Sequence, residues 1–123
     1  MRINVVLNSI NKEKNGSLQL VAYDKEEIGI LEIITHGLDY FKIDKFKVQE
    51  KHRKQGVGKK LIESAVEIIK ESGGKEIIVF PNSEPYSGES PIDNQQLCEI
   101  YEKLGFELID KPLDIKKEYI RKI

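Results

Sequence analysis

The segment from Val48 to Ser72 constrains the fold most, because it reads as a strand end, a glycine turn and an amphipathic helix in that order. Apolar residues recur through it at a period of about 3.6, typical of a helix with one buried face: Val57, Leu61, Ile62, Ala65, Val66, Ile68 and Ile69. Gly56 and Gly58 stand where this helix begins, inside a basic turn, and their missing Cβ atoms would let a ligand approach the main chain. The first amides of a helix lack partners and carry the positive end of its dipole. We therefore predict an anion site at the start of the helix, suited to phosphate or pyrophosphate.

Two well-known phosphate-binding patterns do not fit this turn. A phosphate loop of the form GxxxxGK[ST] would need a glycine at Arg53 and a hydroxyl residue at Lys60. A dinucleotide-binding turn of the form GxGxxG would need its third glycine at Leu61. A tight turn surrounded by solvated lysines stays open as a simpler interpretation. The turn alone therefore indicates an anion site without identifying the anion.

The rest of the chain predicts an α/β domain of the α+β type. The expected strands are 2–7, 18–23, 28–35, 40–48, 76–81, 106–109 and 118–123, the expected helices 56–71 and 94–104, and the expected loops or turns 8–17, 82–93 and Lys111-Pro112. The first four strands follow one another with short polar connections, which is typical of an antiparallel meander. The fifth comes after a helical crossover and should therefore lie parallel to the fourth. The expected architecture is a central mixed, mostly antiparallel, twisted sheet with two main helices.

Length and charge place limits on the kinds of partner. A chain of 123 residues with 39% apolar content is long enough for a core, and we expect a single domain over 1–123. Its 20 basic and 21 acidic side chains nearly cancel, so only the local basic patch at 51–60 could bind nucleic acid. That patch lacks the interleaved aromatic residues on which bases stack. No apolar run approaches the ~20 residues that span a bilayer. Neither nucleic acid nor a membrane is an expected partner.

Cysteine and histidine usage predicts neither a disulfide nor a metal site. The single cysteine, Cys98, lies at a helix-face position and is expected to be a small packed residue. His36 and His52 are the only histidines, and no pair of residues has the spacing of metal ligands. Together with an N-terminus that lacks a signal-peptide pattern, this favours a reducing, cytoplasmic setting. A monomer and a homodimer both stay open.

Two segments together resemble the motifs of the GCN5-related N-acetyltransferase (GNAT) family. The turn RKQGVG at 53–58 resembles the family signature [RQ]-x-x-G-x-[GA]. The segment NQQLCEIYEKLGF at 94–106 resembles the second motif, N-x-x-A-x-x-L-Y-x-x-x-G-F, with Leu97 for the alanine and Ile100 for the leucine. The resemblance covers about residues 41–110 and implies the family's fold, with its usual two helices after the first strand reduced or missing here. It also implies transfer of an acetyl group from acetyl-coenzyme A to a primary amine of a small molecule or peptide.

The resemblance further implies which residues bind the donor. Backbone amides of the glycine turn would cradle the pyrophosphate of coenzyme A, and the strand before it would run beside the pantetheine arm like an added strand. Asp93 or Asn94 is a natural cap for the second helix, and Asn94 would cap that helix, touch the coenzyme, or both. The implied set is Phe46, Lys47, Val48, Arg53, Lys54, Gln55, Gly56, Val57, Gly58, Lys59 and Asn94. For the side chains of Arg53 and Lys54, solvation without a phosphate contact stays an alternative.

Tyr101 is the expected general acid, since the tyrosine of this motif lies near the coenzyme sulfur in the family. A phenol with its ordinary pKa of about 10 is protonated at neutral pH and can donate a proton to the thiolate. The position of the glutamate that serves as base in some relatives is taken here by Lys42. Asp44 follows two residues later and should share a strand face with Lys42 and Phe46 by simple alternation. It is the candidate catalytic base, and an ordinary exposed aspartate is the alternative. Weaker candidates are Glu32, Glu84 and Glu89, and loss of the amine proton to water is a further alternative.

The loop at 82–93 is longer than the family usually has between these elements. We hypothesise that it closes over the acceptor site in place of the missing helices, and that its acidic residues suit a cationic amine. A surface insertion without this role is the alternative. For the whole chain, the alternative to an enzyme is a non-catalytic acyl-coenzyme A-binding module.

Overall fold

A computed structural model describes residues 1–8, 15–109 and 117–123 of the chain. The strands are β1 (Arg2–Asn8), β2 (Asn15–Asp24), β3 (Glu26–His36), β4 (Tyr40–Val48), β5 (Glu76–Val79), β6 (Glu107–Ile109) and β7 (Glu118–Lys122). The helices are the short 3₁₀ helix η1 (Glu50–His52), α1 (Val57–Glu71) and α2 (Asn94–Lys103). Residues 15–17, expected in a loop, belong to β2, while the rest of that loop after Asn8 and the turn at Lys111-Pro112 lie outside the described residues.

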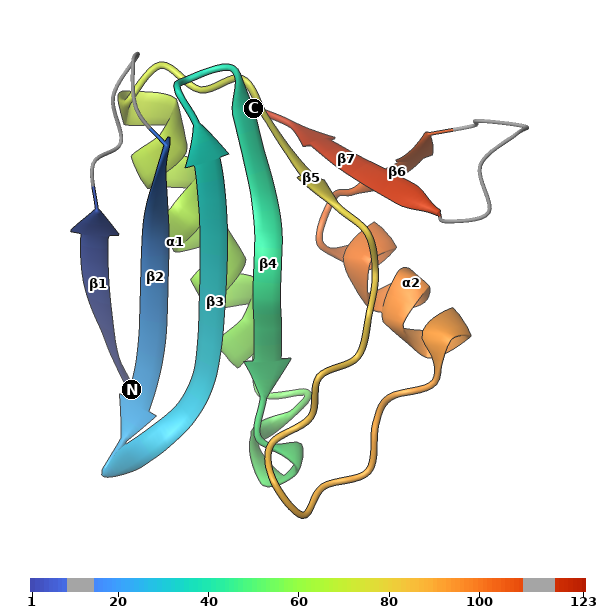
Figure 1. The fold of residues 1–123 in the computed structure, drawn as a ribbon. Coiled ribbons are helices and arrows are strands. Elements are labelled where there is room, and N and C mark those ends of the chain that lie inside the picture. The colour runs from blue at the N-terminus through green and yellow to red at the C-terminus, as the bar shows by residue number, and fades with distance from the viewer. Residues whose placement is uncertain (9–14, 110–116) are drawn as a thin grey trace.

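The described strands form one sheet in the order β1-β2-β3-β4-β5-β7-β6 (Figure 1). The first four are antiparallel neighbours in chain order, which confirms the predicted meander. β5 joins β4 in parallel after the α1 crossover, also as predicted. β7 then enters between β5 and β6 and pairs with both in antiparallel fashion. The sheet is therefore mixed and mostly antiparallel, with two main helices.

α1 packs its apolar face on the meander and so places its own first turn beside β4. Leu61, Ile62 and Ala65 are fully buried in the core that the helix shares with the sheet. A Cβ atom at Gly29 of β3 would come within 3.2 Å of the side chains of Val57 and Leu61, so this glycine lets the helix lie close to the strand. Among the described residues, no helix is both long and apolar enough to cross a membrane.

β4 and β5 separate after a short contact. Their register holds one pair, Lys42 with Ile78. β5 was expected to reach residue 81 but ends at Val79, after which the chain leaves the sheet and runs beside β4 toward η1 before it turns into α2 (Figure 1). The edge of β4 beyond this pair therefore has no neighbouring strand among the described residues. The site lies around this edge.

A register shift in β4 changes which way its side chains point. Lys45 pairs with Glu32 of β3, but the next pair is Ile43 with Ile33, so Asp44 is an extra residue. Phe46 consequently falls on the buried side with α1, where a Cβ at Gly58 would lie 3.0 Å from its Cζ. The expectation that Asp44, Lys42 and Phe46 share one face is wrong, because a bulge breaks the two-residue alternation.

Candidate active site

The start of α1 presents backbone amides without a side-chain cap. Its first helical hydrogen bond runs from the Lys60 amide to the Gly56 carbonyl at 3.0 Å, so the amides of Val57, Gly58 and Lys59 precede it and have no partner within the helix. The cap residue, Gly56, offers no side chain, and the first turn contains no acidic residue. This end of the helix therefore carries positive partial charge that an anion would complement.

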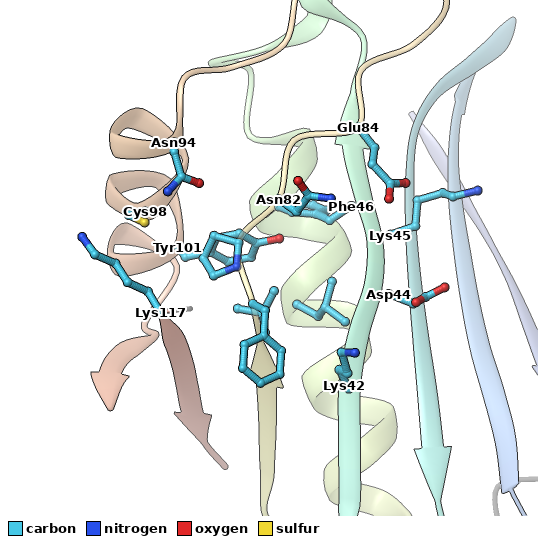
Figure 2. A pocket seen from close by; sticks show the side chains of 14 residues that line it. Lys42, Asp44, Lys45, Phe46, Asn82, Glu84, Asn94, Cys98, Tyr101 and Lys117 are labelled. Carbon is cyan, nitrogen blue, oxygen red and sulfur yellow. The ribbon is translucent and has the colours of Figure 1, made fainter. Parts of the chain in front are cut away.

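The start of α2 is built differently. The Asp93 carboxylate accepts the amides of Gln95 at 2.8 Å and Gln96 at 3.3 Å, which satisfies this helix end internally. Asp93 is thus the cap, one of the two residues proposed for it. Asn94, the other, instead lines a cavity beside Tyr101 (Figure 2).

The two glycines of the turn serve different purposes. Gly56 has φ of 82°, a left-handed conformation that disfavours side chains, and a Cβ there would meet nothing within 4 Å. Gly58 makes room for the Phe46 ring, as the 3.0 Å approach shows, and a Cβ there would also lie 3.7 Å from the Val48 side chain. Only Gly56 leaves open space for a ligand; Gly58 allows α1 to approach β4. Close ligand approach was expected at both positions.

A groove of about 630 Å³ lies between the first turn of α1 and one side of α2, and we call it the α1–α2 groove. It collects the predicted donor-binding residues except Gln55 and Asn94, namely Phe46, Lys47, Val48, Arg53, Lys54, Gly56, Val57, Gly58 and Lys59. α2 and the residue that caps its end contribute apolar side chains that sequence reasoning did not assign to the site: Leu97, Ile100 and Leu104. Gln55 is exposed and donates to the Lys51 carbonyl at 3.4 Å, within its own turn.

A second cavity, of about 690 Å³, lies where β4 and β5 separate, and we call it the Tyr101 cavity (Figure 2). Its lining residues are Lys42, Ile43, Asp44, Lys45, Phe46, Val79, Phe80, Pro81, Asn82, Glu84, Asn94, Cys98, Tyr101 and Lys117. Phe46 lines this cavity and the α1–α2 groove alike. The two spaces therefore adjoin at Phe46, with the uncapped start of α1 beside one and the tyrosine beside the other.

Tyr101 is held in a fixed position by aromatic neighbours. Only 2% of it is exposed, and its ring centroid lies 5.8 Å from that of Phe46 and 5.4 Å from that of Phe106. In Figure 2 its hydroxyl points toward β4. Burial, and secondarily the neighbouring Cys98, raises the pKa of this phenol above its ordinary value of 10.0. The group is therefore a proton and hydrogen-bond donor across the physiological range.

The candidate bases are less well placed. Asp44 lines the Tyr101 cavity but is exposed, and in Figure 2 its carboxylate lies on the side of β4 away from Tyr101. Glu84 also lines the cavity. Glu32 accepts a hydrogen bond from Gln19 at 3.3 Å on the neighbouring strands. Among the described residues, none of these carboxylates forms a hydrogen bond with the tyrosine hydroxyl.

The loop at 82–93 is fixed to the sheet and to the turn before α1. The Tyr86 hydroxyl donates to a Glu27 carboxylate oxygen at 2.8 Å, and the Lys47 ammonium lies 4.4 Å from the centre of the Tyr86 ring. Glu89 accepts from Arg53 at 3.3 Å and from the Glu50 amide at 3.0 Å. Sequence reasoning missed these contacts; an aromatic residue within a polar loop was the available signal, but its partners are distant in the chain.

The part of the chain that the structure describes contains no group of three or more His, Cys, Asp or Glu side chains arranged to hold a metal ion. Cys98 is a free cysteine on the buried face of α2, and sequence analysis had predicted a small packed residue at this position.

A family model for the acetyltransferase (GNAT) domain matches residues 15–108, which is most of the chain. The match includes both segments whose resemblance to this family was noted in the sequence. No curated protein matches the sequence itself.

Several solved structures share the fold. The PaiA N-acetyltransferase from Thermoplasma acidophilum, solved with coenzyme A, has 19% identity and a TM-score of 0.70, covering 87% of this chain and 61% of its own. The aminoglycoside 6'-N-acetyltransferase from Enterococcus faecium has 18% identity and a TM-score of 0.66, covering 86% of this chain and 74% of its own. A Bacillus anthracis protein solved with acetyl coenzyme A has 24% identity and a TM-score of 0.64, covering 93% of this chain and 65% of its own. The chain thus spans less than two thirds of the first and third of these proteins.

Proposed function

The chain belongs to the GNAT acetyltransferase family, and from this premise we propose that it transfers an acetyl group from acetyl-coenzyme A to a primary amine of a small molecule or peptide. The observation that carries the proposal is the meeting of the α1–α2 groove and the Tyr101 cavity at Phe46. A donor bound in the groove would reach the tyrosine past this side chain, while the acceptor approaches through the cavity.

The groove suits the parts of coenzyme A. The uncapped amides of Val57, Gly58 and Lys59 would donate to its diphosphate, and the positive charge of Lys54 and Lys59 would add to the helix dipole. The edge of β4 at 46–48 has no strand beside it in the described chain and can hydrogen-bond a pantetheine arm in the manner of an added strand. The apolar side chains of α2 would cover the other side of that arm.

The residues of the Tyr101 cavity would carry out the proton transfers. Acetyl-coenzyme A, when bound, supplies the acetyl thioester. Tyr101 holds a proton at its hydroxyl and gives it to the sulfur that leaves as the amine nitrogen bonds to the acetyl carbon. Asp44, exposed on the same cavity, receives the proton that the nitrogen loses, through water because its carboxylate points away from the tyrosine. The acetyl carbon exchanges its bond to sulfur for a bond to nitrogen, and one proton passes from nitrogen to sulfur. The proton taken up by Asp44 then returns through water to the phenolate of Tyr101.

The loop at 82–93 would form one wall of the acceptor site. Asn82 and Glu84 line the Tyr101 cavity, and the contacts of Tyr86 and Glu89 hold the loop in that place. Deletion of residues 84–90 should therefore raise the acceptor KM while leaving the affinity for coenzyme A measurable. An unchanged acceptor KM would contradict this role.

The proposal is tested by calorimetric titration with acetyl-coenzyme A, followed by an acceptor screen that measures free thiol. Binding with amine-dependent thiol release is the expected result. Binding without release for any amine would indicate the acyl-coenzyme A-binding module instead. A folded sample that does not bind coenzyme A at millimolar concentration would contradict both the enzyme and the binding module.

A further inference from the structure

The Tyr101 cavity contains lysines that form no ion pair within the described residues. Three lysines and two carboxylates line it: Lys42, Lys45, Lys117, Asp44 and Glu84. Within the described residues, the ion pairs are Lys51 with Glu26, Arg53 with Glu89 and Arg121 with Glu63, and none involves a residue of this cavity. The acidic residues of the loop were expected to suit a cationic amine. Glu89, however, is paired with Arg53, and lysines outnumber carboxylates in the lining of the cavity.

Of the three lysines, Lys42 has the best-defined position in the cavity. It lies on β4 at the pair with Ile78, where β4 and β5 begin to separate, and it is half-buried. Its ammonium lies 5.4 Å from the centre of the Phe80 ring, a contact that positions the charge without neutralising it. Because burial makes an unpaired charge costly, this ammonium would gain more from an anion than a solvated lysine would.

The other two lysines differ in their surroundings. Lys45 stands opposite Glu32 in the β3–β4 register, and in Figure 2 it extends away from Tyr101. Lys117 comes just before β7, and in Figure 2 its side chain extends away from Tyr101 on the α2 side of the cavity. Neither of these two side chains is therefore directed at the tyrosine.

We infer that the acceptor is an amine that also carries an acidic group, a carboxylate or a phosphate, and that Lys42 binds this group. The inference rests on the proposed function and specifies its acceptor. A purely cationic polyamine would meet the ammonium of Lys42 and be repelled, whereas an acidic amine would place its anion on that ammonium and keep its nitrogen free to react. Lys42 is thereby a specificity-determining residue.

The test compares amines that differ in the acidic group. L-Glutamate is set against its diamide, in which neither carboxylate remains, and O-phosphoethanolamine against ethanolamine. Spermidine represents polyamines, and each amine is used at equal concentration of its unprotonated form. The expected wild-type preference in kcat/KM is for the acidic member of a pair, and the two pairs distinguish a carboxylate from a phosphate. Lys42→Met should raise the KM of that acidic amine about tenfold to a hundredfold, the effect of losing one charge-assisted hydrogen bond. Lys42→Arg keeps the positive charge, so its KM for the acidic amine should stay close to the wild-type value.

Lys70→Met is the control, since it removes an exposed lysine of α1 that lines neither the Tyr101 cavity nor the α1–α2 groove; it should change the KM little. A wild-type preference for spermidine, or an equal loss for all amines in Lys42→Met, would overturn the inference. If acetyl-coenzyme A binds but no amine reacts, the protein loaded with acetyl-coenzyme A is titrated calorimetrically with L-glutamate and with O-phosphoethanolamine. Absence of binding that depends on Lys42 would then overturn the inference. Failure to bind acetyl-coenzyme A would instead refute the proposed function, and this inference with it.

Discussion

The guanidinium of Arg53 lies 3.3 Å from the carboxylate of Glu89, although 36 positions separate them in the chain. The other oxygen of that carboxylate accepts the Glu50 amide at 3.0 Å, and the Arg53 Nε donates to the Val48 carbonyl at 3.1 Å. One acidic side chain thereby connects the acceptor-side loop to the turn that begins α1. The arrangement places a negative charge beside the proposed diphosphate site.

Removal of that charge should strengthen donor binding. Glu89→Gln keeps an acceptor for the Glu50 amide but no longer competes with a diphosphate for Arg53, so the Kd for coenzyme A should fall about twofold to fivefold, as expected for a partly exposed pair. Calorimetry measures this directly. Glu84→Gln removes a charge from the same loop at the acceptor cavity and should leave the Kd unchanged. A weaker Kd in Glu89→Gln would show that the contact supports the site instead of competing with it.

Loss of the Tyr101 hydroxyl should abolish most turnover without loss of binding. Tyr101→Phe keeps the ring that packs between Phe46 and Phe106 but removes the proton donor, and kcat should fall about 10²-fold or more. Coenzyme A affinity and thermal unfolding should change little. Tyr119→Phe is the control, because that buried hydroxyl donates to Glu102 at 3.1 Å and should affect stability, not kcat. Full activity in Tyr101→Phe would refute the acid role.

The pH profile should have no alkaline limb from Tyr101. Because burial raises its pKa, the phenol stays protonated through the range near pH 10 where an exposed tyrosine ionises. Activity should therefore rise with pH as the acceptor amine loses its proton and should then stay level to pH 10. A decline between pH 8 and pH 10 in wild type that disappears in Tyr101→Phe would contradict this assignment.

The role of the left-handed glycine at the start of α1 in binding can be tested by comparison with a second left-handed glycine elsewhere in the chain. Gly56 and Gly88 have φ of 82° and 83°, and a Cβ at either would meet nothing within 4 Å. Alanine at either position should cost about 1 kcal/mol of unfolding free energy, measured in urea. Only Gly56→Ala should weaken coenzyme A binding, because it alters the direction of the first amides of α1. Equal effects on binding would show that the turn does not hold the donor.

Arg121 should stabilise the C-terminal strand in a pH-dependent manner. It donates to both oxygens of Glu63 on α1, at 2.8 and 3.1 Å, and to the Leu104 carbonyl at 2.9 Å. Glu63 is 47% exposed, so Arg121→Met should cost only about 1 kcal/mol. The hydrogen bond from Arg121 lowers the pKa of Glu63 below its ordinary value of 4.5. The ionic part of this contribution is therefore complete above pH 4.5 and is lost as the pH falls through the folded-state pKa. A loss that is independent of pH in urea titrations would contradict the ionic part.

Much of the fold could be predicted because it depends on local patterns. The 3.6-residue period of α1 and the polar breaks between strands are properties of neighbouring residues, and β4 was predicted with its observed bounds. The fifth strand was predicted too long because Phe80 and Pro81 extend an apolar run. In the structure these two side chains line the Tyr101 cavity and the strand has already ended. An apolar pattern does not distinguish a side chain that faces a cavity from one that faces the core.

The sequence by itself determined the helix start with its uncapped amides, the tyrosine seven positions after Asn94, and the family to which both motifs point. Only the tertiary structure decided that Phe46 stands between groove and cavity, that Arg53 is paired with Glu89, and that Asp44 points away from Tyr101. The physical reason is that these facts depend on how separated segments meet. A single bulge in β4 shifts every later side chain to the other face, and no local pattern records it.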